Sequence, residues 1–569
     1  MVSREVTMRN AISRVLALVV LGTAVAACSE PTTSSTVAGT PRFSSSARTG
    51  APLDIPEVKM DLPLRLRPWD TSSVALVDAI AAEDGHAIVA FKEAGSRRAL
   101  ETGVRSPVTA GTIDAGLALL SARGGEILNF YDAIGAAHVR IPPAIAADLR
   151  SNPLVDYIEP RQYRGLQGTR LGAASVSKLP SALLPQTVPW GVQLVQAPSG
   201  WPTSRGTGAK IELIDTGMDT THEDLPHPPA TNCAGALDGC RDAFPLPHGS
   251  HVMGIWTARD NAVGVIGVAP GINATDVFAY GACSDQDGHC PTSEIITGIN
   301  AGIFDAKVIN MSFGGTSYDA GEANAVASAW NNGIVLVAAA GNVPEVSLGT
   351  VIYPAGYTNV IGVSGVKTDK SFASSSPCPG SPSSNSGSHV DLAAPFWALS
   401  TVPGGYQSET SGWCGTSMAT PHVSGVAALV RAARPSWTKQ QVVTRLFNTA
   451  EDLGIVGRDN NFGNGLVNAY NALTTTLSIN GPGFISQKAT YTFNAVYSRF
   501  NTTPTFFWEE KQCSTCAWVH VGGSTASFTR TLSPNCSQGW DVYHLRTTAT
   551  DTWGMSNTST KDVYLCERP

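Results

Sequence analysis

The sequence predicts a protein whose largest part is an α/β domain with a doubly wound, mostly parallel sheet. Three observations define this domain and the two that flank it. From about 190 to 475, short apolar runs alternate with helix-like segments, as in a parallel sheet that helices cover on both faces. A smaller α+β pattern precedes this region. A stretch with β-rich runs and no helix pattern follows it and predicts a β-sandwich.

The composition fits an exported protein with several domains. The chain has 569 residues, with 43% hydrophobic and 15% charged residues, which is enough apolar material for large cores. The net charge of −7 is mild for this length, so nothing indicates nucleic-acid binding. The 56 glycines and 36 prolines fit a loop-rich extracellular protein.

The N-terminus has the pattern of a targeting segment. Arg4, Arg9 and Arg14 precede an apolar run, 15–28, that is too short to span a bilayer, so a secretory signal is expected. The run ends in small residues before Cys28, which resembles a bacterial lipobox and predicts lipidation of that cysteine. The alternative is an ordinary signal peptide that is cut after "AVA". We expect a bacterial cell-envelope lipoprotein or a secreted protein, in contact with a membrane only through this anchor.

The cysteine count agrees with export. The chain has 11 cysteines, and removing Cys28 leaves an even set of ten, as expected for disulfides in an exported protein. Cys233 and Cys240 are close neighbours, as are Cys283 and Cys290, and elimination leaves Cys378 with Cys414. The C-terminal part holds four more, in three possible pairings: Cys513, Cys516, Cys536 and Cys566.

The N-terminal domain is predicted at 72–160, between a flexible tether at 28–71 and a linker at 161–189. Its strand and helix patterns alternate in the manner of a ferredoxin-like α+β fold. The expected strands are 86–92, 136–141 and 155–160, and the expected helices are 114–125 and 142–152.

In the two remaining domains, 190–475 and 476–569, the expected elements follow from the apolar patterns. The α/β domain has predicted strands at 209–215, 274–280, 306–313, 333–340, 359–366 and 389–394. Its clearest helices are 292–306 and 319–333. The C-terminal strands are predicted at 488–498, 504–510, 527–532, 543–551 and 561–566.

Three polar residues stand where such a domain places chemistry. Asp215 ends a strand and precedes a turn, so it could also be a plain turn former. His248 follows in "PHGSHVMG", where His251 raises the alternative of a metal pair, but no third ligand is visible. Ser417 begins a helix, where backbone N–H groups favour an oxyanion. A serine nucleophile needs a base, and the base needs a carboxylate.

The order Asp215, His248, Ser417 is one of several known for this triad, and the surrounding blocks are specific. "ELIDTGMD", "HGSHVMG" and "GTSMATPHVSGVAALV" resemble the three signature blocks of the subtilisin-like serine proteases, the subtilases. The resemblance covers about 190–475. It implies a doubly wound sheet, a peptide substrate, His248 as the base and no catalytic metal.

The same resemblance extends to the binding residues. Asn342 in "VAAAGN" resembles the oxyanion-hole residue and would act with the backbone N–H of Ser417. Ser312, Phe313 and Gly314 resemble the edge segment that pairs with an extended substrate. Ile352 stands where the floor of the primary specificity pocket is often formed, and a branched side chain there would favour small residues before the cleaved bond.

The resemblance also suggests roles for the outer domains. The N-terminal domain resembles inhibitor-type propeptides, which block the cleft with their C-terminal strand, here near "VDYIEP", and it predicts autocleavage between 160 and 190. The C-terminal domain resembles bacterial immunoglobulin-like modules. Structural Ca²⁺ is common in the family, and the loop "CSDQDGHC" is a candidate, although no complete ligand motif is visible.

Together these observations predict an autoprocessed serine endopeptidase that is a monomer, acts on extended protein substrates and uses no catalytic cofactor. The alternative is a binding protein with a subtilase fold that has lost its activity. The intact set of Asp215, His248, Ser417 and Asn342 argues against that alternative. Six further histidines are expected in loops, on the surface or in structural positions: His222, His227, His289, His389, His251 and His422.

Overall fold

The computed structural model of the protein defines three folded regions. The described residues are 72–92, 109–166, 185–235, 240–243, 245–302, 305–343, 346–375, 378, 383–408, 413–485, 487–511, 515–532 and 541–565. Cys28 and the predicted signal segment lie outside these ranges. Within them, no helix is both long enough and apolar enough to cross a bilayer.

The N-terminal domain has the predicted ferredoxin-like fold. Its four-stranded antiparallel sheet has the order β2-β3-β1-β4, and a buried apolar core holds the helices against one face. The strands are β1 His86–Phe91, β2 Glu126–Tyr131, β3 Ala136–Arg140 and β4 Val155–Pro160. The helices are α3 Ser73–Ala82, α5 Ala110–Ala122 and α6 Ala146–Arg150, with 3-10 turns η1 Asp132–Ile134 and η2 Pro143–Ile145.

A seven-stranded sheet forms the centre of the α/β domain, and every pair of neighbouring strands in it is parallel. Its order is β16-β14-β12-β10-β6-β8-β7. The strands are β6 Ile211–Asp215, β7 Cys233–Gly235, β8 Val277–Gly281, β10 Val308–Met311, β12 Val335–Ala339, β14 Val360–Val366 and β16 Leu392–Pro395. All six predicted strands are present, and β7 is additional.

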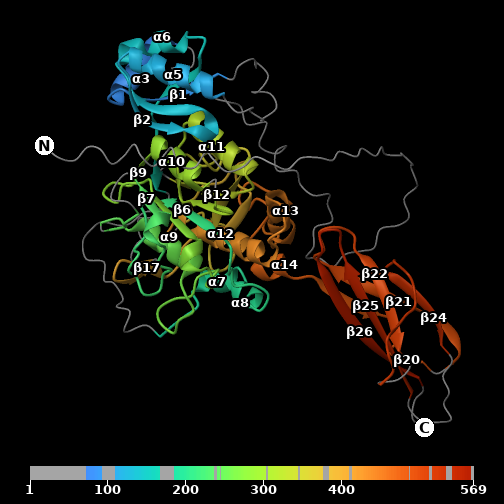
Figure 1. Cartoon of the computed structure of the whole chain (residues 1–569). Helices are drawn as coiled ribbons and strands as arrows, with labels where there is room; N and C mark the ends of the chain where they lie inside the picture. The colour runs from blue at the N-terminus through green and yellow to red at the C-terminus, as the bar shows by residue number, and fades with distance from the viewer. Residues whose placement is uncertain are drawn as a thin grey trace. The chain divides into compact units, whose positions relative to one another are not determined.

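Helices cover both faces of this sheet, as the sequence predicted. On one face α12 packs on β10, β12, β14 and β16 and contacts α9, while α10 and α11 pack together on the other (Figure 1). The long helices are α9 His248–Thr257, α10 Thr292–Gly302, α11 Ala320–Asn331, α12 Thr416–Ala433 and α13 Lys439–Thr449. The short helices are α7 Trp190–Leu194, α8 Ala197–Gly200 and α14 Ala469–Leu473, with 3-10 turns η4 Ala230–Asn232 and η5 Ala274–Asp276.

The strand order reverses beside β6, because the chain moves to β8 on one side of it and to β10 on the other. Such a switch point leaves a crevice at the carboxyl ends of the strands, where α/β proteins bind ligands. Asp215 is the last residue of β6 and therefore lies at this place.

Smaller sheets surround the central one. A three-stranded sheet has the order β11-β5-β9, and two-stranded sheets join β13 to β15 and β17 to β18. Their strands are β5 Tyr163–Leu166, β9 His289–Pro291, β11 Phe313–Gly314, β13 Asn342–Val343, β15 Ser383–Ser384, β17 Ser400–Val402 and β18 Gly405–Gln407. The disulfides Cys233–Cys240, Cys283–Cys290 and Cys378–Cys414 are formed as predicted.

The C-terminal domain is a β-sandwich, as predicted, with two sheets around one apolar core that includes Phe493, Trp508 and Leu545. One sheet contains β19 Thr476–Asn480, β21 Ala489–Ser498 and β24 Ser527–Leu532. The other contains β20 Phe484–Ile485, β26 Ser556–Leu565, β25 Asp541–Thr550, β22 Thr505–Lys511 and β23 Val519–His520. Cys516 is disulfide-bonded, whereas Cys513, Cys536 and Cys566 lie outside the described residues.

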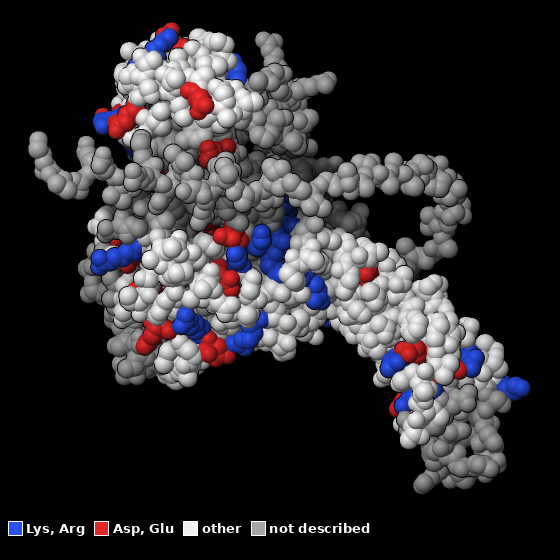
Figure 2. Space-filling view, viewed as in Figure 1, with Lys and Arg blue, Asp and Glu red and all other residues white. Residues whose placement is uncertain are grey.

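The charged residues do not separate by sign on the face drawn in Figure 2. Acidic and basic side chains intermingle over the α/β domain there (Figure 2). This face therefore offers no extended surface of one charge that would attract a polyanion.

Candidate active site

The predicted carboxylate and base form a buried pair. The Nδ1 atom of His248 lies 2.7 Å from Oδ1 of Asp215, and both side chains have no exposed surface. His248 is the first residue of α9, and Asp215 is the last residue of β6. The other ring nitrogen, Nε2, is buried and has no hydrogen-bond partner among the described residues. An imidazole held in this way has Nε2 available for proton transfer.

Two residues that the sequence analysis did not single out hold the start of α9. Pro247 precedes the helix and provides no side-chain cap. Instead the Thr216 hydroxyl accepts from the Gly249 N–H at 2.8 Å, and Oδ2 of Asp242 accepts from the Ser250 N–H at 2.6 Å. These contacts satisfy two N–H groups that a helix start otherwise leaves without partners.

A carboxylate network links this helix start to Asp215. The Thr216 N–H donates to Oδ1 of Asp215 at 2.8 Å, and its hydroxyl donates to Oδ1 of Asp242 at 2.8 Å. Burial raises the pKa of Asp242 to about 7, against the effect of its hydrogen bonds to Ser250 and Thr216. Gly249 is required here, because a Cβ at this position would lie 1.9 Å from the Gly217 carbonyl oxygen.

The predicted nucleophile lies at the start of another helix. Ser417 is the second residue of α12, after Gly415 at the N-cap, and it is fully buried. Its hydroxyl donates to the Ser312 carbonyl at 2.7 Å, and the Ser312 hydroxyl donates to the Ser417 carbonyl at 3.0 Å. These two bonds bring the predicted nucleophile and the predicted substrate-binding segment together.

The Asn342 amide is held in one orientation. Its Oδ1 accepts from the Thr416 N–H at 3.0 Å and from the Thr416 hydroxyl at 3.2 Å. Its Nδ2 is therefore the end that remains to donate, and this atom is buried with no hydrogen-bond partner among the described residues. Because α12 starts beside it, a donor pair of Nδ2 and helix N–H groups can stabilise a negative oxygen. Sequence reasoning found Asn342 but not Thr416.

The arrangement therefore combines a carboxylate-held imidazole, a serine hydroxyl and oriented amide donors. Known proteins match much of this chain. The sequence profile described as "Subtilase family" matches residues 206–465. M-protease of Shouchella clausii (strain KSM-K16) is 35% identical over 347 residues, which cover 60% of this chain and 80% of that protein. Subtilisin E of Bacillus subtilis (strain 168) is 33% identical over 361 residues, 62% of this chain and 84% of that protein.

The chain belongs to the subtilase family. It is thus a serine-type endopeptidase with the α/β fold that its sequence predicted. A solved structure of the psychrophilic subtilisin-like protease Apa1 from the Antarctic psychrotroph Pseudoalteromonas sp. AS-11 also matches, at 23% identity and a TM-score of 0.43. That match covers 51% of this chain and 98% of the other.

The predicted substrate-binding edge of this subtilase is already paired. Phe313 and Gly314 of β11 lie opposite Leu166 and Gly165 of β5 in an antiparallel register. The other edge of β5 pairs with β9 in an antiparallel register. The sequence predicted this strand near "VDYIEP", but Val155–Pro160 itself forms β4 in the N-terminal sheet. The strand on the catalytic edge follows it, in a segment that the sequence analysis assigned to the linker.

The N-terminal domain of the subtilase contacts the helices α10 and α11. Both carboxylate oxygens of Glu159 accept from the start of α11, at 3.1 Å from Ala320 N–H and 2.8 Å from Gly321 N–H. A carboxylate is favourable at this positive end of a helix. The Tyr131 hydroxyl donates to the Ser293 carbonyl of α10 at 2.8 Å.

Ile352 is fully buried beside the predicted oxyanion residue. A Cβ at Gly341 would lie 2.7 Å from Cγ1 of Ile352, so the two residues are in close contact. Gly341 has a φ of +98° and directly precedes Asn342. The side chain of Ile352 thus lies where its size can influence the space next to the oxyanion donors.

The second histidine of "PHGSHVMG", His251, takes no part in the proton transfer. His251 is fully buried, stacks on Trp413 with ring centroids 4.6 Å apart, and has Nε2 3.2 Å from the Gln407 carbonyl. Burial lowers its pKa to about 3. His422 is similar: its Nδ1 lies 2.8 Å from the Met418 carbonyl, and burial lowers its pKa to about 4.

The expected loop histidines divide into two groups. His227 and His289 are exposed, whereas His222 and His389 are buried within their loops. The Nε2 atom of His389 lies 2.9 Å from the Ala340 carbonyl oxygen, close to the predicted oxyanion residue. The described residues contain no group of three or more His, Cys, Asp and Glu side chains suited to a metal ion. Calcium in the loop Cys283–Cys290 stays a prediction.

Proposed function

We propose that Asp215, His248 and Ser417 form the catalytic triad of this endopeptidase. The observation that carries the proposal is the buried 2.7 Å contact between His248 Nδ1 and Asp215 Oδ1, which leaves Nε2 as the base. The Ser417 hydroxyl turns from the Ser312 carbonyl to Nε2, loses its proton and attacks the peptide carbonyl. His248 then passes the proton to the leaving amine, and water hydrolyses the acyl-enzyme by the same route.

In this mechanism Asn342 Nδ2 and the Ser417 N–H stabilise the oxyanion of the tetrahedral intermediate. Ser312, Phe313 and Gly314 bind the substrate by β-strand addition, a main-chain pairing that selects extended chains and leaves side-chain preference to the neighbouring pockets. Ile352 shortens the primary specificity pocket and favours small residues before the cleaved bond. Strong cleavage after Phe or Tyr in a peptide library would contradict the role of Ile352.

We also propose that the chain is made as a zymogen. The strand Tyr163–Leu166 takes the place of a substrate on β11, while residues 72–160 hold it there through contacts such as those of Glu159. Cleavage after this strand, within 160–190, would separate the inhibitor from the enzyme. The chain is further proposed to be exported, lipidated at Cys28 and monomeric.

The decisive test uses the full chain made in a protease-free translation system. The wild type should yield a shortened mature chain, label with a serine-directed fluorophosphonate and hydrolyse casein in the presence of a chelator. Ser417→Ala should stay full length, unlabelled and inactive. The same shortened chain from Ser417→Ala would disprove self-processing, and activity without labelling would disprove the triad. Mass spectrometry of protein made in bacteria would locate the mature N-terminus and show whether Cys28 carries lipid.

A further inference from the structure

One side chain of the strand on the catalytic edge is buried much more deeply than its neighbours. Arg164 is 1% exposed, whereas Tyr163 beside it is 39% exposed. Alternate residues of a strand point to opposite sides, so Arg164 enters the catalytic domain where Tyr163 faces outward. Charged side chains are rarely buried to this degree unless a partner receives them.

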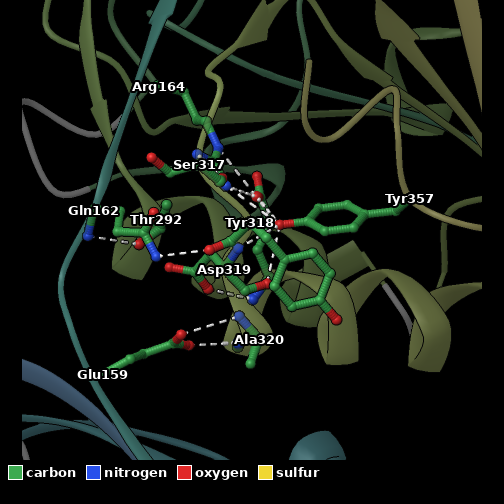
Figure 3. Close-up of polar contacts among 11 residues, drawn as sticks. Glu159, Gln162, Arg164, Thr292, Ser317, Tyr318, Asp319, Ala320 and Tyr357 are labelled. Atoms are coloured by element: carbon green, nitrogen blue, oxygen red, sulfur yellow. Dashed lines mark hydrogen bonds and ion pairs between the residues drawn. The ribbon is translucent and has the colours of Figure 1, made fainter. Parts of the chain in front are cut away.

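The pocket around Arg164 consists of groups from the catalytic domain. The guanidinium Nε donates to Oε2 of Glu322 at 3.1 Å, and Nη2 donates to the same oxygen. Nη1 donates to the Ser317 carbonyl at 2.8 Å, and Nη2 also lies 3.2 Å from the Tyr357 hydroxyl. Figure 3 shows Arg164 pointing towards Ser317 and Tyr357. Three nitrogens of one planar group thus have partners, a pattern that suits arginine better than lysine.

Glu322 is fully buried on α11. Asp319 caps this helix, because its side chain accepts from the Glu322 backbone N–H at 2.8 Å. Within its own domain the Glu322 carboxylate accepts from the Tyr357 hydroxyl at 2.8 Å. Its charge partner, however, comes from the N-terminal segment. Burial raises the pKa of this carboxyl, and the Arg164 guanidinium opposes the rise. A buried carboxylate without a cation is costly. Once Arg164 has left, the pocket beside Glu322 should therefore favour binding of another cationic side chain.

The backbone beside the pocket leaves space for a long side chain. A Cβ at Gly315 would lie 3.2 Å from both Cδ and Nη1 of Arg164, so a larger residue would crowd the path of the guanidinium. The strand register fixes which substrate residue meets the pocket. Leu166 lies opposite Phe313, so the next residue of a bound chain would lie opposite Ser312, whose carbonyl contacts the Ser417 hydroxyl.

We propose that Glu322, with Tyr357 and Ser317, forms a specificity pocket that selects arginine at the substrate position equivalent to Arg164. If the bond after the residue opposite Ser312 is cleaved, this is the fourth residue before the cleaved bond. The inference rests on the proposed function, because it requires substrates to occupy the strand position of Tyr163–Leu166. It names the substrate class: extended chains with an arginine at this position.

The test compares quenched fluorescent peptides based on the chain's own sequence 163–170, YRGLQGTR. Alanine replaces Gln167, so that a small residue precedes the cleaved bond, and the second position is arginine, citrulline, lysine or alanine. Citrulline matches arginine in shape but has no charge. With the active wild-type enzyme, kcat/KM for the arginine peptide should exceed that for the citrulline peptide by on the order of 10²-fold, with lysine between them. In Glu322→Gln the ratio of arginine to citrulline should fall towards one. Glu451→Gln, which removes the partner of Lys370 elsewhere in the domain, should keep the wild-type ratio.

Equal rates for arginine and citrulline in the wild type would overturn the proposal, and this result does not depend on the folding of any variant. An unchanged ratio in Glu322→Gln would overturn the role of that residue. If casein is hydrolysed but none of the four peptides is cleaved, the strand register is wrong and the inference fails alone. If casein is not hydrolysed either, the proposed function fails with it.

Discussion

The helices that carry the predicted base and the predicted nucleophile start in different ways. At the start of α9, two N–H groups are occupied by Thr216 and Asp242, and His248 is held rigidly against Asp215. At the start of α12, Gly415 provides no side-chain cap, and Asn342 binds the Thr416 N–H with its oxygen while its nitrogen stays available. The base is thus fixed by protein groups, whereas the nucleophile's helix keeps donors for a substrate oxygen.

This difference teaches what each helix start contributes. An imidazole must keep one tautomer and one orientation, so protein contacts around it are useful. An oxyanion exists only during the reaction, so its donors must be oriented in advance and yet unoccupied. Three substitutions, given from the largest expected effect to the smallest, can break or sharpen the comparison.

The largest of these effects should come from Asn342→Ala. This change removes an oxyanion donor and should lower kcat by about 10²–10³-fold with little change in KM. The magnitude is the one measured in subtilisin, a member of this family. Steady-state kinetics on a peptide substrate would check it, with Asn332→Ala on the exposed end of α11 as the control. A rise in KM with unchanged kcat would assign Asn342 to ground-state binding instead.

A smaller effect is expected from Thr416→Val. The hydroxyl that donates to Asn342 Oδ1 at 3.2 Å is lost, while the backbone donor stays, so the amide is less firmly oriented. We expect kcat to fall by roughly 10-fold, the cost of about one hydrogen bond of 1–1.5 kcal/mol. Thr420→Val is the matched control, because its hydroxyl donates back to the Thr416 carbonyl at 2.7 Å and has no bond to Asn342 among the described residues. Equal losses in both variants would mean that the helix itself was disturbed.

At the start of α9, Asp242→Asn should act mainly on stability. Burial raises the pKa of Asp242 to about 7 from an ordinary 3.8, so the folded state binds a proton more tightly than the unfolded state. The stability of the folded state should therefore fall as the pH rises from about 4 to 7. The measurement uses a Ser417→Ala background, which prevents autolysis. There Asp242→Asn should make the fall of unfolding free energy with pH less steep, by up to about 1.4 kcal/mol per pH unit.

Urea unfolding between pH 4 and 7 would measure the slope for Asp242→Asn. Asp224 is the matched control, because burial also raises its pKa to about 7 although it lies apart from the start of α9. Asp224→Asn should reduce the slope in the same direction, and in the active enzyme it should leave kcat unchanged. An identical slope in wild type and Asp242→Asn would contradict the raised pKa.

The sequence predicted the parts of this molecule that repeat a local pattern. The six strands from β6 to β16 are apolar runs that burial on both faces requires, so they were visible without any tertiary information. β7 escaped because Cys233–Gly235 is only three residues long and contains a glycine. β5 escaped because Tyr163–Leu166 has no strand pattern of its own, and pairing with β11 and β9 determines its conformation.

The candidate site divides in the same way. Asp215, His248, Ser417 and Asn342 stand in recognisable motifs, and the structure brings Asp215 to His248 and Ser417 to Ser312. Thr416, Thr216 and Asp242 act through contacts that only the fold creates. Glu322 was part of a predicted helix, but the apolar periodicity of that helix does not reveal that the Glu322 carboxylate is fully buried.

The position of β5 between two strands has a consequence for the substrates. A chain that replaces Tyr163–Leu166 exposes both of its edges to β11 and β9 and must be extended over about four residues. In a folded protein, the backbone N–H and C=O groups of such a segment are already hydrogen-bonded within its own helix or sheet. The rate of attack on a native protein should then follow how often that segment opens, so susceptibility reports the local unfolding equilibrium of the target.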